Sequence, residues 1–168
     1  YIVDAISGAL IWSTSSTGTP TLTLSKMNYS MPSSPRAIDL NGDGLADQFF
    51  IGDTGGQLWR FFINNGNPSN TLISPTDSDG SNSMSSSDGV FASIGGSGTA
   101  NFRRFYNSPD VALTKHNGQL QMAISIGSGY RAHPLSVDAQ DRFYSFRTSQ
   151  VYGSANAVAH TTLTESDL

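Results

Sequence analysis

The amino-acid sequence predicts an all-β protein, and three features of the chain support this prediction. Charged residues make up only 13% of the 168 residues, whereas Gly, Ser, Thr and Asn are abundant, a balance typical of strands joined by many turns. Of the 13 acidic residues only Glu165 is a glutamate, so negative charge sits on aspartate, which favours turns over helices. The apolar runs are short and are bounded by Gly, Asp, Asn and Pro, as expected of strands.

Composition also argues against several classes of protein. A formal net charge of -4 argues against a nucleic-acid partner, which requires a basic surface. The absence of cysteine excludes a disulfide scaffold, a thiolate zinc site and a cysteine nucleophile. No apolar run approaches the roughly 20 residues of a membrane-spanning helix, and no signal peptide opens the chain. Tyr1 begins directly in a strand-like stretch, so we expect a piece of a longer protein.

The first part of the chain contains two predicted strand pairs. Residues 1–12 read as a hairpin, because two apolar runs flank an Asp/Gly turn. Residues 13–35 are rich in Ser, Thr and Pro, and we expect irregular structure there with a short strand at 21–24. Residues 48–52 (QFFIG) and 57–63 (QLWRFFI) are predicted strands on either side of the tight turn DTGG.

We assign residues 1–149 to one β-rich domain that contains a long insertion. Residues 64–100 are dominated by Ser, Asn, Gly and Asp, and a loop of this length is usually functional or mobile. Its one apolar island is 90–94. Structure is expected to resume in four short segments, 103–106, 110–113, 119–127 and 142–147. The tail at 150–168 is weakly patterned, and we predict no element there.

The segment DLNGDGLAD, from Asp39 to Asp47, predicts a calcium-binding loop between two strands. Counting from its first residue, side-chain oxygens fall at positions 1, 3, 5 and 9, which are Asp39, Asn41, Asp43 and Asp47. Calcium takes about six to eight hard oxygen ligands, and alternate side chains of a curled loop can face one ion. Gly44 permits the sharp turn, and Leu45 offers its backbone carbonyl. Without a cation, three carboxylates this close would repel one another.

This loop is not an EF-hand. An EF-hand requires a bidentate Glu at its twelfth position, where this chain has Phe50, and the flanking residues are strand-like instead of helical. What remains is a shorter loop whose last ligand is Asp47, set in a β-hairpin. Magnesium fits less well because it prefers fewer protein ligands and retains its water. The alternative is an Asp/Asn/Gly turn that joins two strands without a metal.

Other polar candidates carry less information. Asp77-Ser78-Asp79-Gly80 repeats the start of the loop but lacks the later acids, so we predict no second calcium there. The histidines are scattered, and their spacing indicates neither a zinc site nor a catalytic triad; they are His116, His133 and His160. We interpret Arg103-Arg104 as a solvated or ion-paired edge, not as an anion site.

Three sets of internal echoes predict a repeated β-unit. A turn followed by an apolar–aromatic strand occurs at 7–12, 55–61 and 140–146, and we expect the aromatic residues of these segments to form core; they are Trp12, Trp59, Phe61, Tyr144 and Phe146. The segment 34–39 (SPRAID) matches 108–113 (SPDVAL), and FIGD matches SIGS. Repeats of about 40–50 residues with several short strands are typical of propeller blades. The chain therefore holds about two to three blades, fewer than closure requires.

The same segments resemble a known family. Residues 34–61 (SPRAIDLNGDGLADQFFIGDTGGQLWRF), 105–113 (FYNSPDVAL) and 124–147, which contains GYRAHPL and DRFYSFR, look like the C-terminal propeller of PilY1/PilC-type proteins. These are type IV pilus assembly factors and tip adhesins of Gram-negative bacteria. The resemblance covers most of 1–147 and excludes the insertion and the tail.

The resemblance implies a fold, a site and a function. The fold is a modified seven-bladed β-propeller, of which this chain is a fragment with a calcium-binding hairpin loop. The implied Ca²⁺ ligands are Asp39, Asn41, Asp43, Asp47 and the carbonyl of Leu45. The implied function is pilus extension against retraction, twitching motility and surface adhesion. Minor pilins, the assembly machinery, or a host or abiotic surface are the implied partners. The implied location is the periplasm, outer membrane or cell surface at the pilus tip, as a secreted protein.

Two other functions stay open at this point. An integrin-type propeller module uses a similar Asp-Asn-Asp-Gly loop for cell-surface binding, but such loops would be expected in successive blades, and this chain has one full copy. Strands such as DAISGALIW also resemble those of quinone-dependent dehydrogenases. We identify no set of acids and aromatic residues for a quinone and no catalytic residues, so we favour a protein that is not an enzyme.

Overall fold

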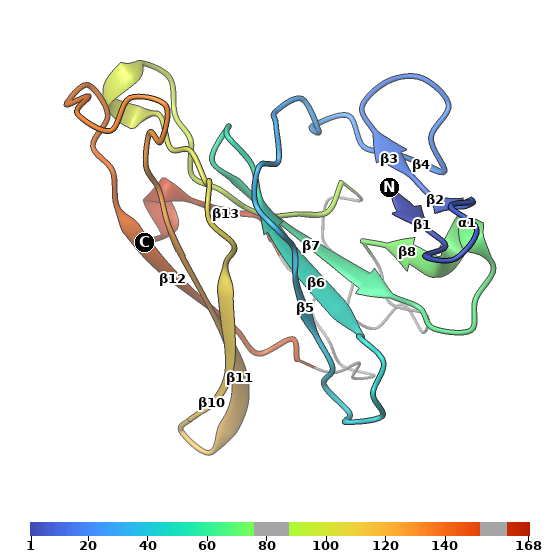
Figure 1. The fold of residues 1–168 in the computed structure, drawn as a ribbon. Coiled ribbons are helices and arrows are strands. Elements are labelled where there is room, and N and C mark those ends of the chain that lie inside the picture. Colours follow the sequence, from blue (N-terminus) through green and yellow to red (C-terminus); the bar gives the residue numbers. More distant parts are fainter. Residues whose placement is uncertain (76–87, 152–160) are drawn as a thin grey trace.

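The computed structural model describes residues 1–75, 88–151 and 161–168, and its regular structure is almost entirely β, which confirms the predicted fold class. The helical elements in these ranges are one turn of α-helix, α1 (Ser69–Leu72), and two 3-10 turns, η1 (Thr99–Asn101) and η2 (Glu165–Asp167). Figure 1 shows two main sheets as neighbouring layers, with the short N-terminal strand pairs on the other side of the larger one. No helix in the described ranges is long and apolar enough to cross a bilayer.

The larger sheet has six strands in the order β13-β9-β7-β6-β5, with β8 also paired to β7. Its strands are β5 (Arg36–Ile38), β6 (Gln48–Gly52), β7 (Gln57–Ile63), β8 (Ile73–Ser74), β9 (Val90–Ser93) and β13 (Leu163–Thr164). The neighbours from β5 to β9 are antiparallel, whereas β13 lies parallel to β9.

The smaller main sheet is an antiparallel meander of β10 (Asp110–His116), β11 (Gln119–Gly127) and β12 (Phe143–Thr148). Its first turn holds Asn117 at φ 50° and Gly118 at φ 78°, and Asn-Gly is the preferred sequence for a two-residue turn with both φ values positive. Two short pairs complete the fold. They are the antiparallel β1 (Ile2–Val3) and β2 (Leu10–Trp12), and the parallel β3 (Thr14–Ser15) and β4 (Leu22–Thr23).

The six-stranded sheet is buried on both faces. Its central strand β7 is buried at every position but the last, unlike a sheet with one solvated face. One face packs against the smaller sheet through Phe50, Leu58, Phe91, Phe105, Met122, Ile124, Ile126, Tyr144 and Phe146. The other face packs against the N-terminal segment through Trp12, Leu24, Trp59, Phe61, Ile73 and Val90. All five aromatic residues expected in the core are buried, so that prediction is confirmed.

The repeated segments occupy matching places. The SPRAID and SPDVAL segments lead into β5 and β10, which lie side by side. There the Ser108 hydroxyl donates to the Ser34 carbonyl at 2.7 Å, and Arg36 pairs with Asp110 at 3.3 Å. FIGD and SIGS mark the ends of β6 and β11. In the repeated segments, β5 therefore corresponds to β10 and β6 corresponds to β11.

Helical turns and strands also form in segments where the sequence showed little apolar periodicity. Residues 64–100 contribute α1, β8, β9 and η1, and β9 is an integral strand of the large sheet. The tail contributes β13 and η2. Residues 103–106, expected as a strand, form none; Phe105 is nevertheless fully buried and its amide donates to the Asp53 carbonyl at 3.0 Å. Within the described ranges the sheets do not close into a ring.

The close approach of the two sheets at Gly52 predicts a stability effect. A Cβ at this position would lie 2.6 Å from Phe105 Cβ and 2.9 Å from Ile126 Cδ1, so Gly52→Ala should destabilise the fold by about 1–3 kcal/mol through overpacking. Urea unfolding followed by tryptophan fluorescence measures this change. Gly129→Ala is the matched control, because nothing lies within 4 Å of a Cβ there. Equal stability of the two variants would contradict the packing described between the sheets.

Candidate metal site in the β5–β6 hairpin

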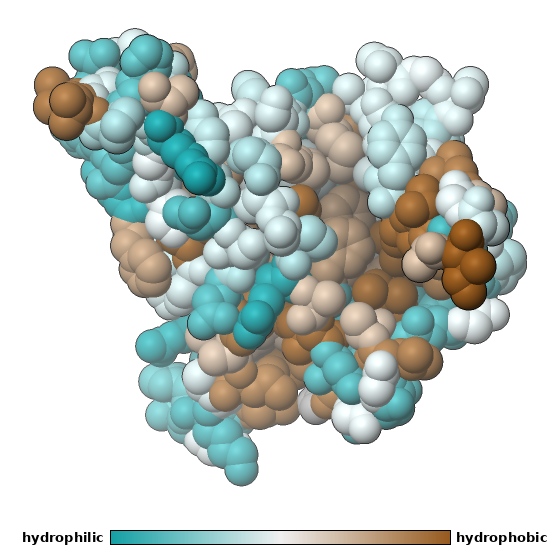
Figure 2. Space-filling model, in the orientation of Figure 1, coloured by the Kyte–Doolittle hydropathy of each residue, from teal (hydrophilic) through white to brown (hydrophobic). Residues whose placement is uncertain are grey.

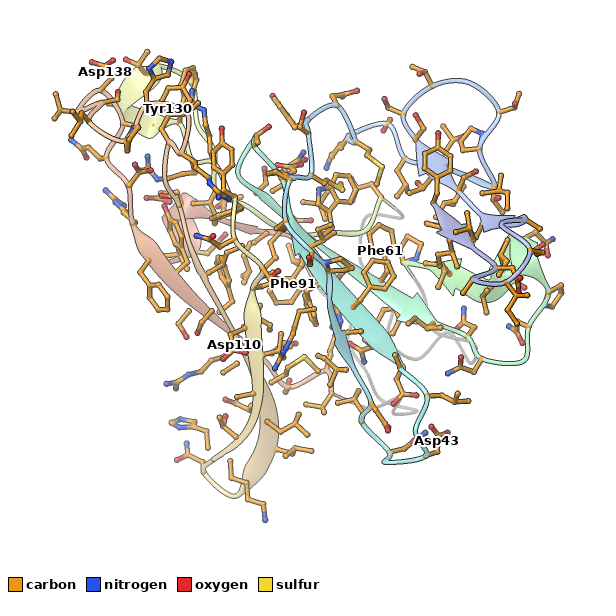
Figure 3. All side chains as sticks on the ribbon, in the orientation of Figure 1. Asp43, Phe61, Phe91, Asp110, Tyr130 and Asp138 are labelled. Atoms are coloured by element: carbon orange, nitrogen blue, oxygen red, sulfur yellow. The ribbon has the colours of Figure 1, made fainter. Side chains whose placement is uncertain are left out.

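The predicted calcium loop connects β5 to β6 at one end of the large sheet. Ile38 and Gln48 face each other in the antiparallel ladder, and the Asp47 amide donates to the Ile38 carbonyl at 2.8 Å, which closes the base of the loop. All the predicted ligand residues therefore fall in one hairpin connection. Figure 3 shows Asp43 at the far tip of this connection, away from the body of the sheets.

Two glycines give the loop its curl. Gly42 lies at φ 78° and Gly44 at φ 88°. This is the left-handed backbone conformation, which residues other than glycine rarely adopt. A Cβ at either position would meet nothing within 4 Å. The requirement for glycine is therefore conformational and not steric.

The carboxylates are turned back onto the loop's own backbone. Asp39 accepts the Gly42 amide on Oδ1 at 2.7 Å and the Gly44 amide on Oδ2 at 2.8 Å. These two bonds, with Gly44 the stronger cause, lower the pKa of Asp39 below its ordinary value. Asp43 Oδ1 accepts the Leu45 amide at 2.8 Å. Backbone amides of the loop therefore orient the Asp39 and Asp43 carboxylates.

The remaining ligand residues make the same kind of contact. Asn41 Oδ1 accepts the Asp43 amide at 2.9 Å, and Asp47 Oδ2 accepts the Leu40 amide at 2.6 Å. A carboxylate has about four lone-pair positions, so these bonds leave further acceptor capacity on Asp43 and Asp47. All the predicted metal-ligand atoms are oxygens, which suits a hard cation such as Ca²⁺.

The three carboxylates of the loop are not gathered around one point. Among the described residues, no group of three or more His, Asp or Glu side chains is placed to hold a metal ion. The structure thus brings the five predicted residues into one loop without gathering the three carboxylates around one point, and calcium binding stays a prediction.

The other polar candidates do not assemble a second site. His116 ends β10, just before β11, and His133 lies in the loop after β11, so a strand of nine residues, about 30 Å at 3.3 Å per residue, separates them. His160 and the segment from Asp77 to Gly80 lie outside the described residues. The described histidines therefore do not share a metal site or a triad.

Sequence reasoning missed a buried carboxylate at the opposite end of β6. Asp53 is fully buried and accepts the Gly55 and Gln57 amides, both at 2.9 Å. It also accepts the Gln57 side-chain amide at 2.8 Å and the Trp59 indole N–H at 2.9 Å. Burial raises the pKa of this carboxyl, against the lowering effect of the bonds from Trp59 and Gln57. We call Asp53 with its donors Gly55, Gln57 and Trp59 the Asp53 clamp. Its sequence signal was the spacing D-x-G-x-Q-x-W, which places hydrogen-bond donors at alternate residues.

Of the Arg103-Arg104 pair, Arg103 is the ion-paired member. Arg103 is buried, pairs with Glu165 at 3.5 Å and donates to the Tyr144 hydroxyl at 2.6 Å, so the ion-paired interpretation holds for it. Burial is also the main reason that the pKa of Tyr144 is raised. Arg142 contacts the same carboxylate. The Tyr144 hydroxyl also donates to Glu165 at 3.1 Å, so Glu165 ties the C-terminal turn η2 to β12 of the smaller sheet.

The Asp53 clamp predicts a large effect of an isosteric substitution. Asp53→Asn replaces one acceptor oxygen by an NH₂ group that faces other N–H donors. We therefore expect the free energy of unfolding to fall by about 1–3 kcal/mol for each buried group left unpaired. Urea unfolding measures the loss, and near-ultraviolet circular dichroism reports the environment of Trp59. Asp138→Asn, on the exposed β11–β12 loop, is the control. An Asp53→Asn variant as stable as this control would contradict the clamp.

Comparison with known proteins supports a fold assignment. No protein-family model matches the chain, and no curated protein matches it. Among solved structures, the crystal structure of the Pseudomonas aeruginosa PilY1 C-terminal domain matches 99% of this chain with a TM-score of 0.57 and 21% sequence identity. The chain spans about a third of that structure, 34% of its length. The resemblance expected from the sequence is thereby confirmed in three dimensions: the chain is similar in fold to a part of the PilY1 C-terminal domain.

Proposed function

We propose that this chain is a calcium-binding part of a type IV pilus assembly factor and tip protein. One observation carries the proposal. A loop with four oxygen-bearing side chains and two left-handed glycines joins adjacent strands in a chain that is similar in fold to a PilY1 C-terminal domain. The protein acts by binding, and we assign it no catalytic residues.

The strand arrangement supports a propeller fragment. In this proposal β5, β6, β7 and β9 form one four-stranded antiparallel blade, and β10, β11 and β12 belong to the next. The first strands of these two units lie side by side, as the innermost strands of adjacent blades do. The N-terminal hairpin belongs to a further blade, which gives two to three blades of a seven-bladed ring.

The residues that hold the ion are those of the loop. Asp39, Asn41, Asp43 and Asp47 supply side-chain oxygens, and Leu45 supplies its carbonyl. When bound, Ca²⁺ supplies positive charge that offsets the repulsion among the three carboxylates. The loop is anchored to its neighbours, because the Ile63 amide donates to the Asp47 carbonyl at 2.7 Å and the Asn65 side chain donates to the Ala46 carbonyl at 3.0 Å. Ordering of the loop therefore stiffens this end of β5, β6 and β7.

This stiffened end is the part that partners recognise. We infer that it contacts minor pilins or the pilus assembly machinery at the periplasm, outer membrane or cell surface, where it supports pilus extension against retraction. Twitching motility and surface adhesion follow from that contact. Calcium occupancy thereby regulates the pilus through the rigidity of one hairpin.

Calcium should stabilise the chain in a manner that depends on the loop acids. At a calcium concentration of 100 times Kd, a single site adds about 2.7 kcal/mol to the unfolding free energy, and Asp39→Ala or Asp47→Ala should abolish this gain. Isothermal titration calorimetry and thermal unfolding with and without calcium measure it. The control is Asp4→Ala, since Asp4 also accepts backbone amides, from Ile6 and Ser7, in an exposed hairpin turn. Equal calcium binding by wild type and both loop variants would show that the site assignment is wrong.

The role in the pilus is tested in the bacterium that carries the gene. Replacing Asp47 by Ala in the chromosome should reduce surface pili and twitching to the level seen when calcium is chelated, at equal protein abundance. The Asp4→Ala strain should behave as wild type. If Asp47→Ala removed calcium binding in the purified protein but left pili and motility unchanged, the pilus role of the loop would be rejected while the calcium site would stand.

A further inference from the structure

A groove with a cavity volume of ≈ 650 Å³ lies where four connecting segments meet. Its lining includes Tyr29 before β5, Gly55 in the β6–β7 turn, Phe102, Arg104 and Tyr106 before β10, and Tyr130 after β11. The β6–β7 turn and the calcium loop are at opposite ends of β6. Figure 3 shows the same separation, with Tyr130 and Asp43 at opposite ends of the molecule.

Arg104 gives the groove its chemical character. Its guanidinium lies 4.0 Å from the Tyr130 ring centroid and 5.1 Å from that of Phe102. Within the part of the chain that the structure describes, Arg104 has no ion pair or side-chain hydrogen bond. Stacking on rings holds a guanidinium in place while its N–H donors stay available in the plane of the group. Such a group is prepared to bind a carboxylate with two hydrogen bonds.

The surroundings favour an anionic group. Among the residues that the structure describes, no Asp or Glu lines the groove, although the chain as a whole has a net charge of -4. The charge of the adjacent Arg103 is already met by Glu165, which leaves Arg104 as the lining cation free to act on a ligand. The hydroxyls of Tyr29, Tyr106 and Tyr130 have no hydrogen-bond partner among the described residues. The groove thus presents donors to an acceptor-rich ligand.

The walls of the groove are built from closely packed backbone and aromatic rings. Tyr29 lies directly against Gly55, where a Cβ would come within 2.3 Å of its ring. Gly95 and Gly96 continue the wall, so no side chain projects from these positions. Tyr, Phe and Arg are the residue types enriched where proteins bind one another, and they dominate the binding energy of such interfaces.

We propose that this groove binds an acidic peptide segment of a partner protein. An Asp or Glu of the peptide forms the paired contact with Arg104, and neighbouring apolar side chains pack on the tyrosine rings. This site rests on residues separate from the calcium loop, so it stands or falls independently of the proposed calcium function.

The test selects peptides without assuming a sequence. A random twelve-residue library displayed on phage is selected against the full chain, and the recovered peptides are synthesised and measured by fluorescence anisotropy. We expect recovered peptides to be enriched in Asp and Glu, and Arg104→Leu to weaken their binding by at least about tenfold, as for a lost interface residue of this type. Arg104→Lys keeps the charge but not the planar fork, so it should weaken binding by a smaller factor.

The matched control is Arg131→Leu, which removes the same charge from the same neighbourhood but from a residue outside the groove lining. It should bind the peptides as wild type does, and thermal unfolding should show that both leucine variants are folded. A hexamer of galacturonic acid is measured in parallel as a carboxylate-bearing saccharide. The proposal is overturned if recovered peptides lack acids, if Arg104→Leu and Arg131→Leu bind them equally, or if the saccharide binds in an Arg104-dependent way and the peptides do not.

Discussion

The structure depends on one constraint, the burial of β7 on both faces. Leu58 faces the core shared with the smaller sheet, and Trp59 and Phe61 face the core shared with the N-terminal segment. Trp59 and Phe61 stack at 6.2 Å between ring centroids, and Trp12 packs edge-on against Phe61 at 6.3 Å. A strand with large apolar groups on both faces is stable only between two layers. The positions of both layers, and of the loops at the ends of β6 and β7, follow from this strand.

A polar residue inside this arrangement needs partners within the protein, and Arg60 shows how the sheet provides several of them. Its Nε donates to Gln48 Oε1 at 2.9 Å, and its guanidinium lies over the rings of Phe50 and Phe62. Asp53 at the end of β6 is satisfied by four N–H donors in the same way. Buried polar groups with this many partners specify one arrangement of neighbours, since a shifted strand would leave them unpaired. Aromatic packing thus buries the apolar surface of the sheet, and the hydrogen bonds of Arg60 and Asp53 fix the register of β6 and β7.

The limits of sequence-based prediction follow from the distance along the chain over which each feature is encoded. The strands at 48–52 and 57–63, and the aromatic core residues, were predictable because they depend on local apolar runs and nearby turns. The pairing of β13 with β9 was not, because it joins segments about 70 residues apart through two-residue strands. The ion pair between Arg103 and Glu165 was unpredictable for the same reason, because the two residues are far apart in the sequence. The loop that we propose binds calcium was predictable as a unit because its residues are contiguous. The groove is assembled from four separate segments and has no signature in any of them.

The two candidate sites lie at opposite ends of a ladder that cannot slide. A one-residue shift of β7 against β6 would exchange the two faces of β7. Trp59 and Phe61 would leave their core, and the three bonds that Gln57 and Trp59 donate to Asp53 would break. A ligand at the loop therefore has no low-energy register change through which to alter the groove. Any effect of calcium on a partner must act where the loop itself is, through the Asp47 and Ala46 carbonyls that hold Ile63 and Asn65. A peptide in the groove, in turn, is held by Arg104 and the rings around it. This separation means that the two sites can engage different partners, or different parts of one partner, without competing.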